Sequence, residues 1–345
     1  MKYKYLLILL IVFTSCEKVF FKKEISNTPE NNFNIFWNDF DKYYAQFIIK
    51  NINWDSVYNV YKPKIKPGMY DGQLFDVLSK MVNLLKDGHV DLLTPYGVAS
   101  YRGLWPASYP SNQLIDPNKY VNYNNSVYNN RSIIEFGNIK NQNIGYIVIK
   151  TFESKTFGKT DTNYNVIDII LKLLNEKDGI IIDVRANGGG NSANAETIAG
   201  RFADEKRLYS KFRSKIGPGK NDFSEWFDAY IEPKGKTQFK KPVVVLTSRF
   251  TFSSAEMFVM AMKTFPNVTI VGDTTGGGVG NPVYRELPNG WVYRLSTMIG
   301  ALPNLFIIEG KGIYPDNPVV TTKADSALRI DRILEKGIEV INSKI

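Results

Sequence analysis

Cysteine and histidine are nearly absent from this sequence, whose 345 residues include one of each, Cys16 and His89. A structural zinc site needs several cysteine or histidine ligands, and a disulfide framework needs paired cysteines. Both classes are therefore excluded, and we expect neither a metal nor an organic cofactor. Because 43% of the residues are hydrophobic, a chain of this length should form one large or two modest globular domains.

Runs of positive charge are also lacking, although the net charge is +9. The lysines are scattered, and the chain has no stretch of five basic residues and no zinc-finger or RNA-binding signature. We therefore expect no nucleic-acid partner. No segment has eighteen consecutive apolar residues, so the sequence predicts no membrane-spanning helix.

Residues 1–16, MKYKYLLILLIVFTSC, combine two lysines, an apolar run and a small pair before Cys16. This order is that of a secretory signal, and the apolar run is too short to span a bilayer. The small residue before the cysteine resembles a bacterial lipoprotein processing site, in which Cys16 becomes the lipidated N-terminus. An ordinary cleaved signal or a short anchor is the alternative. We expect a lipid-anchored, extracytoplasmic protein of the bacterial envelope, facing the periplasm or the cell surface, with residues 17–30 as its tether.

The rest of the chain divides into a helical front and an α/β back. Within residues 31–94, apolar residues recur every three or four positions over 33–47 and 74–85, which predicts a helical cap. Residues 95–142 form a connecting segment, too short for a separate peptide-binding domain of about 90 residues. From 143 to 345 short β runs alternate with helical patterns, which indicates an α/β core with a largely parallel sheet.

Polar residues gather in four segments, of which the first is the turn Asp87-Gly88-His89. A lone histidine is more often structural than catalytic, but its place in a turn makes His89 a candidate general base. In the second segment, a buried strand with Asp183 and Arg185 runs into the glycines 188–190. Such glycines let backbone N–H groups face an oxyanion or a phosphate, although the spacing of nucleotide-binding loops is missing. Asp183 and Arg185 are interpreted as structural pairing partners.

The third segment places Ser253 at a predicted helix start, three residues before Glu256. A serine there is suited to nucleophilic attack, because free amides and the helix dipole favour negative charge. The same spacing is that of a capping box, and this segment alone does not decide between the two. The fourth segment is a glycine-rich loop with Thr275, Gly276 and Gly277, interpreted as a wall along an extended ligand, a phosphate cradle or a mobile loop.

Taken in order, the four segments resemble the tail-specific, C-terminal processing serine peptidases, in the branch that includes the tricorn core and the interphotoreceptor retinoid-binding repeats. The resemblance covers most of the chain from about residue 33 to 341. It implies an α/β, crotonase-like (ClpP-like) ββα core with an N-terminal helical cap and no PDZ domain. It also implies an extracytoplasmic protein that cleaves unfolded proteins or peptides near their C-termini.

By the same resemblance Ser253 is the nucleophile and His89 the base, with Glu309 as the acid that orders the site. The amide of Ser254, with Gly188 or Gly189, would form the oxyanion hole. Lysine-dependent relatives carry their base on the glycine loop, where this chain has only glycines.

The branch also has a serine beside the histidine, where this chain has Gly88, so Asp87 and Glu309 both remain possible partners of His89. We therefore expect a serine endopeptidase. The alternatives are a peptide- or hydrophobic-ligand-binding lipoprotein on the same fold, and a phosphate-binding enzyme.

Overall fold

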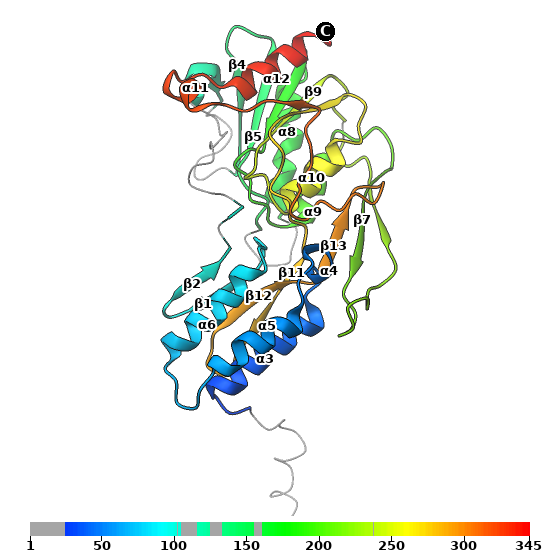
Figure 1. Ribbon diagram of the computed structural model, residues 1–345. Helices are drawn as coiled ribbons and strands as arrows, with labels where there is room; N and C mark the ends of the chain where they lie inside the picture. The colour runs from blue at the N-terminus through cyan, green and yellow to red at the C-terminus, as the bar shows by residue number, and fades with distance from the viewer. Residues whose placement is uncertain (1–24, 102, 105–115, 125–132, 155–160, 237) are drawn as a thin grey trace, which may run out of the picture.

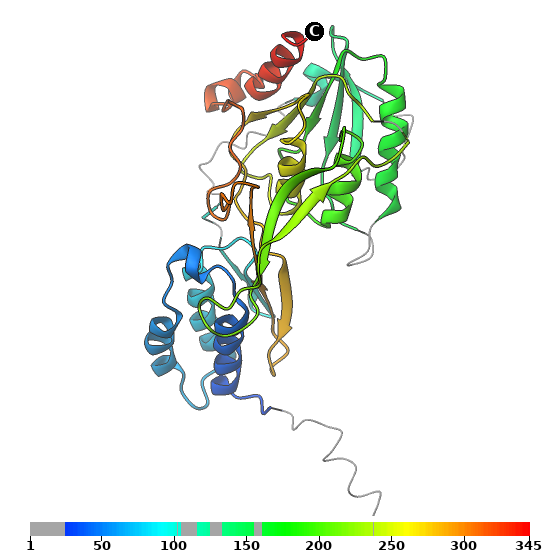
Figure 2. The same cartoon turned by 90° about the vertical axis from the view of Figure 1, so that its right-hand side faces the viewer.

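The computed structural model describes residues 25–101, 103–104, 116–124, 133–154, 161–236 and 238–345. The signal segment with Cys16, most of the tether and parts of the connecting segment lie outside these residues. Two orthogonal views show the N-terminal helices in one part of the molecule and the larger sheet in another (Figures 1 and 2). No helix within the described ranges has the length and apolar character needed to cross a bilayer.

The larger part is the core, built on a seven-stranded sheet in the order β14-β10-β9-β6-β5-β4-β3. The strands from β5 to β14 pair in parallel, and β3 and β4 add an antiparallel edge. This agrees with the predicted α/β class. The strands are β3 (Val121–Tyr123), β4 (Ile134–Ile139), β5 (Ile144–Ile149), β6 (Gly179–Asp183), β9 (Val243–Thr247), β10 (Val268–Gly272) and β14 (Asn317–Pro318).

Helices cover both faces of this sheet, which explains why every residue of β6 and β9 is buried. On one face the apolar core includes residues of α8, α9 and α10, and on the other it includes residues of α12. The core helices are α7 (Pro117–Tyr120), α8 (Ile167–Leu173), α9 (Ser192–Ala199), α10 (Ser254–Met262), α11 (Lys323–Ala327) and α12 (Arg332–Asn342). An antiparallel sheet beside them contains β7 (Arg207–Ser214), β8 (Phe227–Ile231) and β13 (Met298–Ala301).

The cap is not purely helical, and it is not confined to residues 31–94 as predicted. Its helices pack on a four-stranded antiparallel sheet, to which residues 282–296 of the predicted core contribute two strands. The reason is apolar packing, since Phe36 and Phe40 of the first helix lie 5.1 and 6.0 Å from Tyr293, between ring centroids. The elements are α3 (Pro29–Tyr43), α4 (Phe47–Lys50), α5 (Trp54–Tyr61), α6 (Asp71–Leu84), β1 (Asp91–Thr94), β2 (Gly97–Ser100), β11 (Pro282–Glu286) and β12 (Val292–Ser296).

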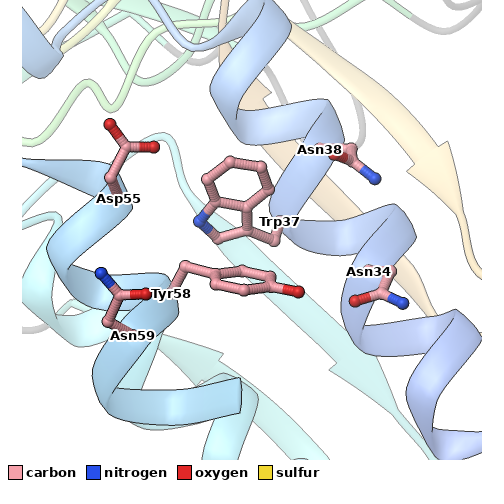
Figure 3. A pocket seen from close by; sticks show the side chains of 6 residues that line it. All are labelled: Asn34, Trp37, Asn38, Asp55, Tyr58 and Asn59. Atoms are coloured by element: carbon pink, nitrogen blue, oxygen red, sulfur yellow. The ribbon is translucent and has the colours of Figure 1, made fainter.

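A pocket of about 300 Å³ lies between α3 and α5 in the cap (Figure 3). Trp37 and Trp54 fasten the two helices beside it, because each indole N–H donates to the other residue's carbonyl oxygen, at 3.1 and 3.0 Å. Most of the apolar residues that recur over residues 33–47 form part of the cap core, while Trp37 also faces this pocket. The lining residues are Asn34, Trp37, Asn38, Asp55, Tyr58 and Asn59.

Arg185, which is 1% exposed, joins the sheet to the C-terminal helix. Its guanidinium contacts Asp183 at 2.6 Å and Asp331 at 2.8 Å, and Asp331 caps α12 by accepting the Leu334 N–H. Tyr146 also donates to Asp183, at 2.7 Å. The predicted Asp183–Arg185 pair is therefore present, and it extends to a third residue 146 positions away along the chain.

Replacing Arg185 with methionine should lower the free energy of unfolding by about 3–5 kcal/mol, because two buried carboxylates lose their counter-ion. Urea denaturation followed by circular dichroism measures this loss. Arg332→Gln is the matched control, since its pair with Asp325 is solvent-exposed and exposed pairs contribute little. Equal midpoints for the wild type and Arg185→Met would contradict the structural role.

Candidate active site

His89 lies in the turn between α6 and β1, and its residue is only 3% exposed. The imidazole stacks on the Phe252 ring with centroids 4.6 Å apart. The glycine loop adjoins both rings, since a Cβ built on Gly278 would overlap Phe252 Cε2 and lie 3.3 Å from His89 Cε1. Neither ring nitrogen has a hydrogen-bond partner among the described residues. The ring is thus held by packing, next to the residue that precedes Ser253.

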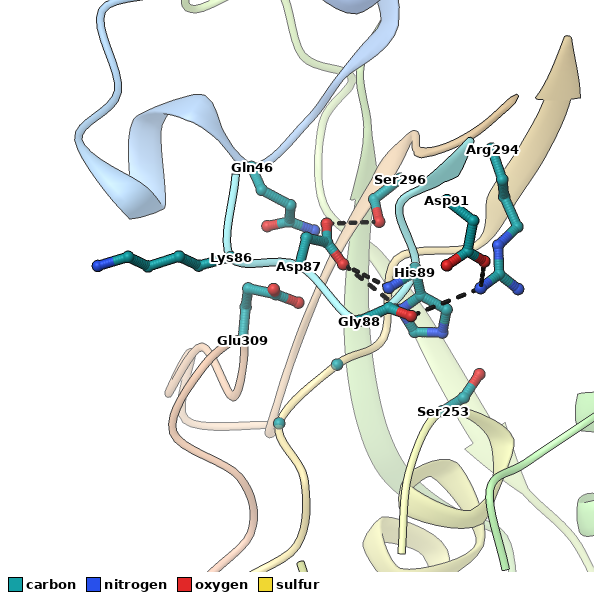
Figure 4. Close-up of polar contacts among 12 residues, drawn as sticks. Gln46, Lys86, Asp87, Gly88, His89, Asp91, Ser253, Arg294, Ser296 and Glu309 are labelled. Carbon is teal, nitrogen blue, oxygen red and sulfur yellow. Dashed lines mark hydrogen bonds and ion pairs between the residues drawn. The ribbon is translucent and has the colours of Figure 1, made fainter. Parts of the chain in front are cut away.

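Asp87 is the carboxylate next to this ring, with Oδ1 4.0 Å from His89 Nδ1. The same oxygen accepts the backbone N–H of His89 at 2.7 Å. The other oxygen accepts the hydroxyls of Tyr44 at 3.0 Å and Ser296 at 2.9 Å. Figure 4 shows the contact with Ser296. Ser296 belongs to β12, more than 200 positions away, and no local sequence signal could have located it. Ser296 thus donates a hydroxyl to Asp87 in a chain that has Gly88, and not a serine, next to His89.

Burial lowers the pKa of His89 from 6.5 to about 4. The negative charge of Asp87 opposes this shift, whereas the positive charges of Arg294 and Lys50 add to it. The imidazole is therefore neutral near pH 7 and can accept a proton, as a general base must.

Ser253 is the N-cap of α10 and has φ 58° and ψ −125°. A positive φ is uncommon for serine and strains the backbone, a feature that gathers at functional sites. The sharp turn also brings Ser253 against the glycine strand end, since a Cβ built on Gly189 would lie 2.7 Å from Ser253 Cβ. The Ser253 hydroxyl points toward the His89 ring (Figure 4). The two predicted chemical groups therefore face each other, without a hydrogen bond between them.

Glu256 forms the predicted capping box with Ser253, whose N–H donates to Oε2 at 3.2 Å. Its buried carboxylate also accepts the Thr275 hydroxyl at 2.6 Å and the amides of Gly277 and Gly278 at 2.8 and 2.7 Å. Burial raises the pKa of Glu256 to about 7, although these hydrogen bonds act in the opposite direction. A helix cap and a strained, part-buried serine thus occur together at one helix start.

That the loop with Thr275, Gly276 and Gly277 lies along an extended ligand stays a prediction. These residues are buried, because Thr275 and Gly277 supply hydrogen-bond donors to Glu256. The next residue, Gly278, shows why no lysine occupies this loop, since a Cβ there would overlap the Phe252 ring. The stack of Phe252 and His89 fills the space that a lysine stem would need.

Of the predicted oxyanion donors, the Gly189 N–H is already engaged, because it donates to Asn187 Oδ1 at 2.9 Å. A Cβ built on Gly188 would meet no atom within 4 Å, so open space adjoins that residue. The Ser254 N–H belongs to the first residue of α10 and has no acceptor within the helix. The geometry thus favours Gly188 and Ser254 as the pair of donors.

Glu309 is paired with Lys50, whose Nζ lies 2.8 Å from Oε1. Its other oxygen, Oε2, is buried and has no partner in the described part of the chain. Burial and the charge of Asp87 raise the pKa of Glu309 to about 8, while Lys50 lowers it. Glu309 therefore reaches the site but makes no hydrogen bond to His89, so its role as the orienting acid stays a prediction, with Asp87 nearer the ring.

Two family models match this chain. The model of peptidase family S41 matches residues 143–319, and that of the tricorn protease C1 domain matches residues 26–83. The chain belongs to peptidase family S41. The S41 match spans the segments that contain Ser253 and Glu309, whereas His89 follows the C1 match.

A solved structure from Parabacteroides merdae is 33% identical, with a TM-score of 0.81, and the match covers 93% of this chain and 100% of that one. The carboxy-terminal-processing protease of Bartonella bacilliformis is 29% identical over 174 residues. That match covers 50% of this chain but only 38% of the relative's length. The structure of the photosystem II D1 C-terminal processing protease is 16% identical, with a TM-score of 0.55 over 91% of this chain and 97% of that chain, and supports the family S41 fold alone.

The single imidazole should titrate near pH 4, well below its ordinary value of 6.5, because burial disfavours its charged form. Since the chain has one histidine, its ring-proton NMR signal can be followed against pH without overlap, and His89→Gln confirms the assignment. The wild type should also lose stability relative to His89→Gln as pH falls from 6.5 to about 4, because the unfolded chain binds the proton first. A midpoint near 6.5 would contradict the buried, neutral ring.

Proposed function

We propose that this chain is a serine endopeptidase of the C-terminal processing type, which hydrolyses peptide bonds of unfolded proteins or peptides. The observation that carries the proposal is the meeting of Ser253, strained at a helix N-terminus, with the neutral His89 ring. Membership of family S41 supports the same reaction class.

In this mechanism His89 removes the proton of the Ser253 hydroxyl as the oxygen attacks the substrate carbonyl carbon. The developing oxyanion is placed next to the amides of Gly188 and Ser254. His89 then passes its proton to the leaving amine, and a water molecule activated by His89 releases the acyl group. Catalytic hydrogen bonds are often long without substrate, so the Ser253–His89 contact has to shorten when a peptide binds.

Asp87 supplies the charge that this cycle needs. When His89 becomes an imidazolium, the carboxylate 4.0 Å from its Nδ1 stabilises the positive charge. The hydroxyls of Tyr44 and Ser296 hold that carboxylate in place. Glu309 is the second acid of the site, and its unpartnered Oε2 leaves it able to take part after a small movement.

Replacing Ser253 with alanine should lower kcat by roughly 10⁴- to 10⁶-fold, because the nucleophile is lost. The assay is hydrolysis of an unfolded protein such as casein, with circular dichroism and the unfolding midpoint as tests of an intact fold. Ser326→Ala is the control, since this serine is exposed on α11. Saturable peptide binding with no Ser253-dependent turnover in the wild type would instead favour the non-catalytic binding protein.

We also propose that the mature chain is held outside the cytoplasm by a lipid on Cys16, as the basic, apolar and small segments of residues 1–16 suggest. The solved structure of a Streptococcus agalactiae lipoprotein has the same fold, at 17% identity and a TM-score of 0.58 over 94% of this chain and 99% of that one.

Cys16→Ser should release the chain from the membrane fraction or leave its signal uncleaved, because the thiol that carries the lipid is gone. Mass spectrometry of the N-terminal peptide measures the acyl groups, and Ser15→Ala serves as the control because a small residue remains before the cysteine. An unmodified Cys16 in a processed chain would exclude lipidation.

A further inference from the structure

Three carboxylates are buried around His89, and they are neutralised in two different ways. Asp87 and Glu256 are each 0% exposed and accept hydrogen bonds from uncharged hydroxyls and backbone amides. Glu309, which is 6% exposed, has a lysine as its partner and keeps one oxygen without a donor among the described residues. The ionisation of Glu309 thus depends on a cation, whereas neutral donors stabilise the other two.

That cation comes from the cap. Lys50 is the last residue of α4, and its Nζ also donates to the Lys86 carbonyl oxygen at 2.9 Å. The Lys50 and Glu309 side chains are only 12% and 5% exposed. Two bonds to the polypeptide therefore hold the ammonium group in a largely buried place.

The segment that contains Lys50 is attached to the strands near the site at several points. The Ala45 N–H donates to the Ser296 carbonyl oxygen, and the Gln46 side-chain amide to the Met298 carbonyl oxygen, both at 2.8 Å. Tyr44, at the start of the segment, donates its hydroxyl to Asp87. Residues 44–50 therefore bring a partner to each of two acids, and Lys50 cannot keep its position unless this segment is docked.

We propose that Lys50 is a positioning residue, which holds the Glu309 side chain in the site and favours its ionised form, so that the ionisation of Glu309 depends on the docking of the cap segment 44–50. The expected effect of Lys50 on turnover rests on the proposed peptidase function. The pairing of Lys50 with Glu309 does not depend on catalysis. Other charged or titratable groups that face Glu309 are Asp87 after α6, Glu256 on α10 and the phenol of Tyr44. The two carboxylates oppose its negative charge, and Lys50 offsets them.

The direction of the pH effect follows from these surroundings. Burial first, and the charge of Asp87 second, raise the pKa of Glu309 from 4.5 to about 8, and Lys50 limits the rise. A carboxyl whose folded pKa is raised loses its proton more readily in the unfolded chain, so folded stability falls as pH rises from 4.5 through about 8. Without Lys50 this loss should become larger and extend to higher pH.

The first experiment measures thermal unfolding of Lys50→Met, Glu309→Gln and the double variant across this range and above it. The Tm of Lys50→Met should fall below that of the wild type by about 5 °C or more at alkaline pH. The same lysine substitution should have little effect in the Glu309→Gln background, because no buried charge is left uncompensated. Lys86→Met is the matched control, since that side chain is exposed and points away from Glu309 (Figure 4).

An equal Tm loss from Lys50→Met in both backgrounds, or a loss that does not vary with pH, would overturn the pairing. This measurement needs no enzymatic activity. It therefore decides the role of Lys50 even if Ser253→Ala and the wild type prove equally inactive, which would refute the peptidase proposal alone.

The second experiment measures kcat and KM against pH. Lys50→Met should lower kcat roughly tenfold at neutral pH, because a smaller fraction of Glu309 is ionised. The acidic limb of the plot of kcat against pH should move to higher pH for the same reason. Lys50→Arg should restore most of the activity, since it keeps the charge. A merely structural role would reduce kcat by one factor at every pH, and this result would overturn the link between Lys50 and the reaction.

Discussion

The burial of three carboxylates in the site that contains His89 is the constraint on which this structure depends. An unpartnered buried charge is costly, so each carboxylate requires donors that no single element can supply. The donors to Asp87 come from the cap segment and β12, those to Glu256 from the glycine loop, and the cation for Glu309 from α4. The site therefore requires residues of both the cap and the core, although the two parts are separate in the fold.

The same burial shifts the acid and the base in opposite directions. It lowers the pKa of His89 to about 4 and raises that of Glu309 to about 8. Opposed shifts of this kind characterise sites in which one group must accept a proton while another changes charge nearby. The neutral ring suits the first proton transfer. The imidazolium that follows is unfavourable in this environment until Asp87, or Glu309 after a movement, compensates its charge.

The sequence predicted those features of the site that depend on residues close together in the chain. The turn at His89, the helix start at Ser253 and the strands of the core follow from spacing within a few residues. Tyr44, Lys50 and Ser296 could not be found in this way, because they reach the site from helices and strands distant in sequence. The hydrogen bonds of the glycine loop could not be predicted either, because the carboxylate that accepts its amides belongs to Glu256, about 20 positions earlier in the chain.

The choice of base is also a matter of space. In lysine-dependent relatives the base is expected on the glycine loop, and here a Cβ at Gly278 would meet both the Phe252 ring and His89 Cε1. A lysine side chain at position 278 and the His89 ring stacked on Phe252 would therefore occupy the same space. A chain can have one or the other, but not both. The proposed histidine mechanism therefore requires a glycine at position 278, because His89 can stack on Phe252 in this way only where the loop has no side chain.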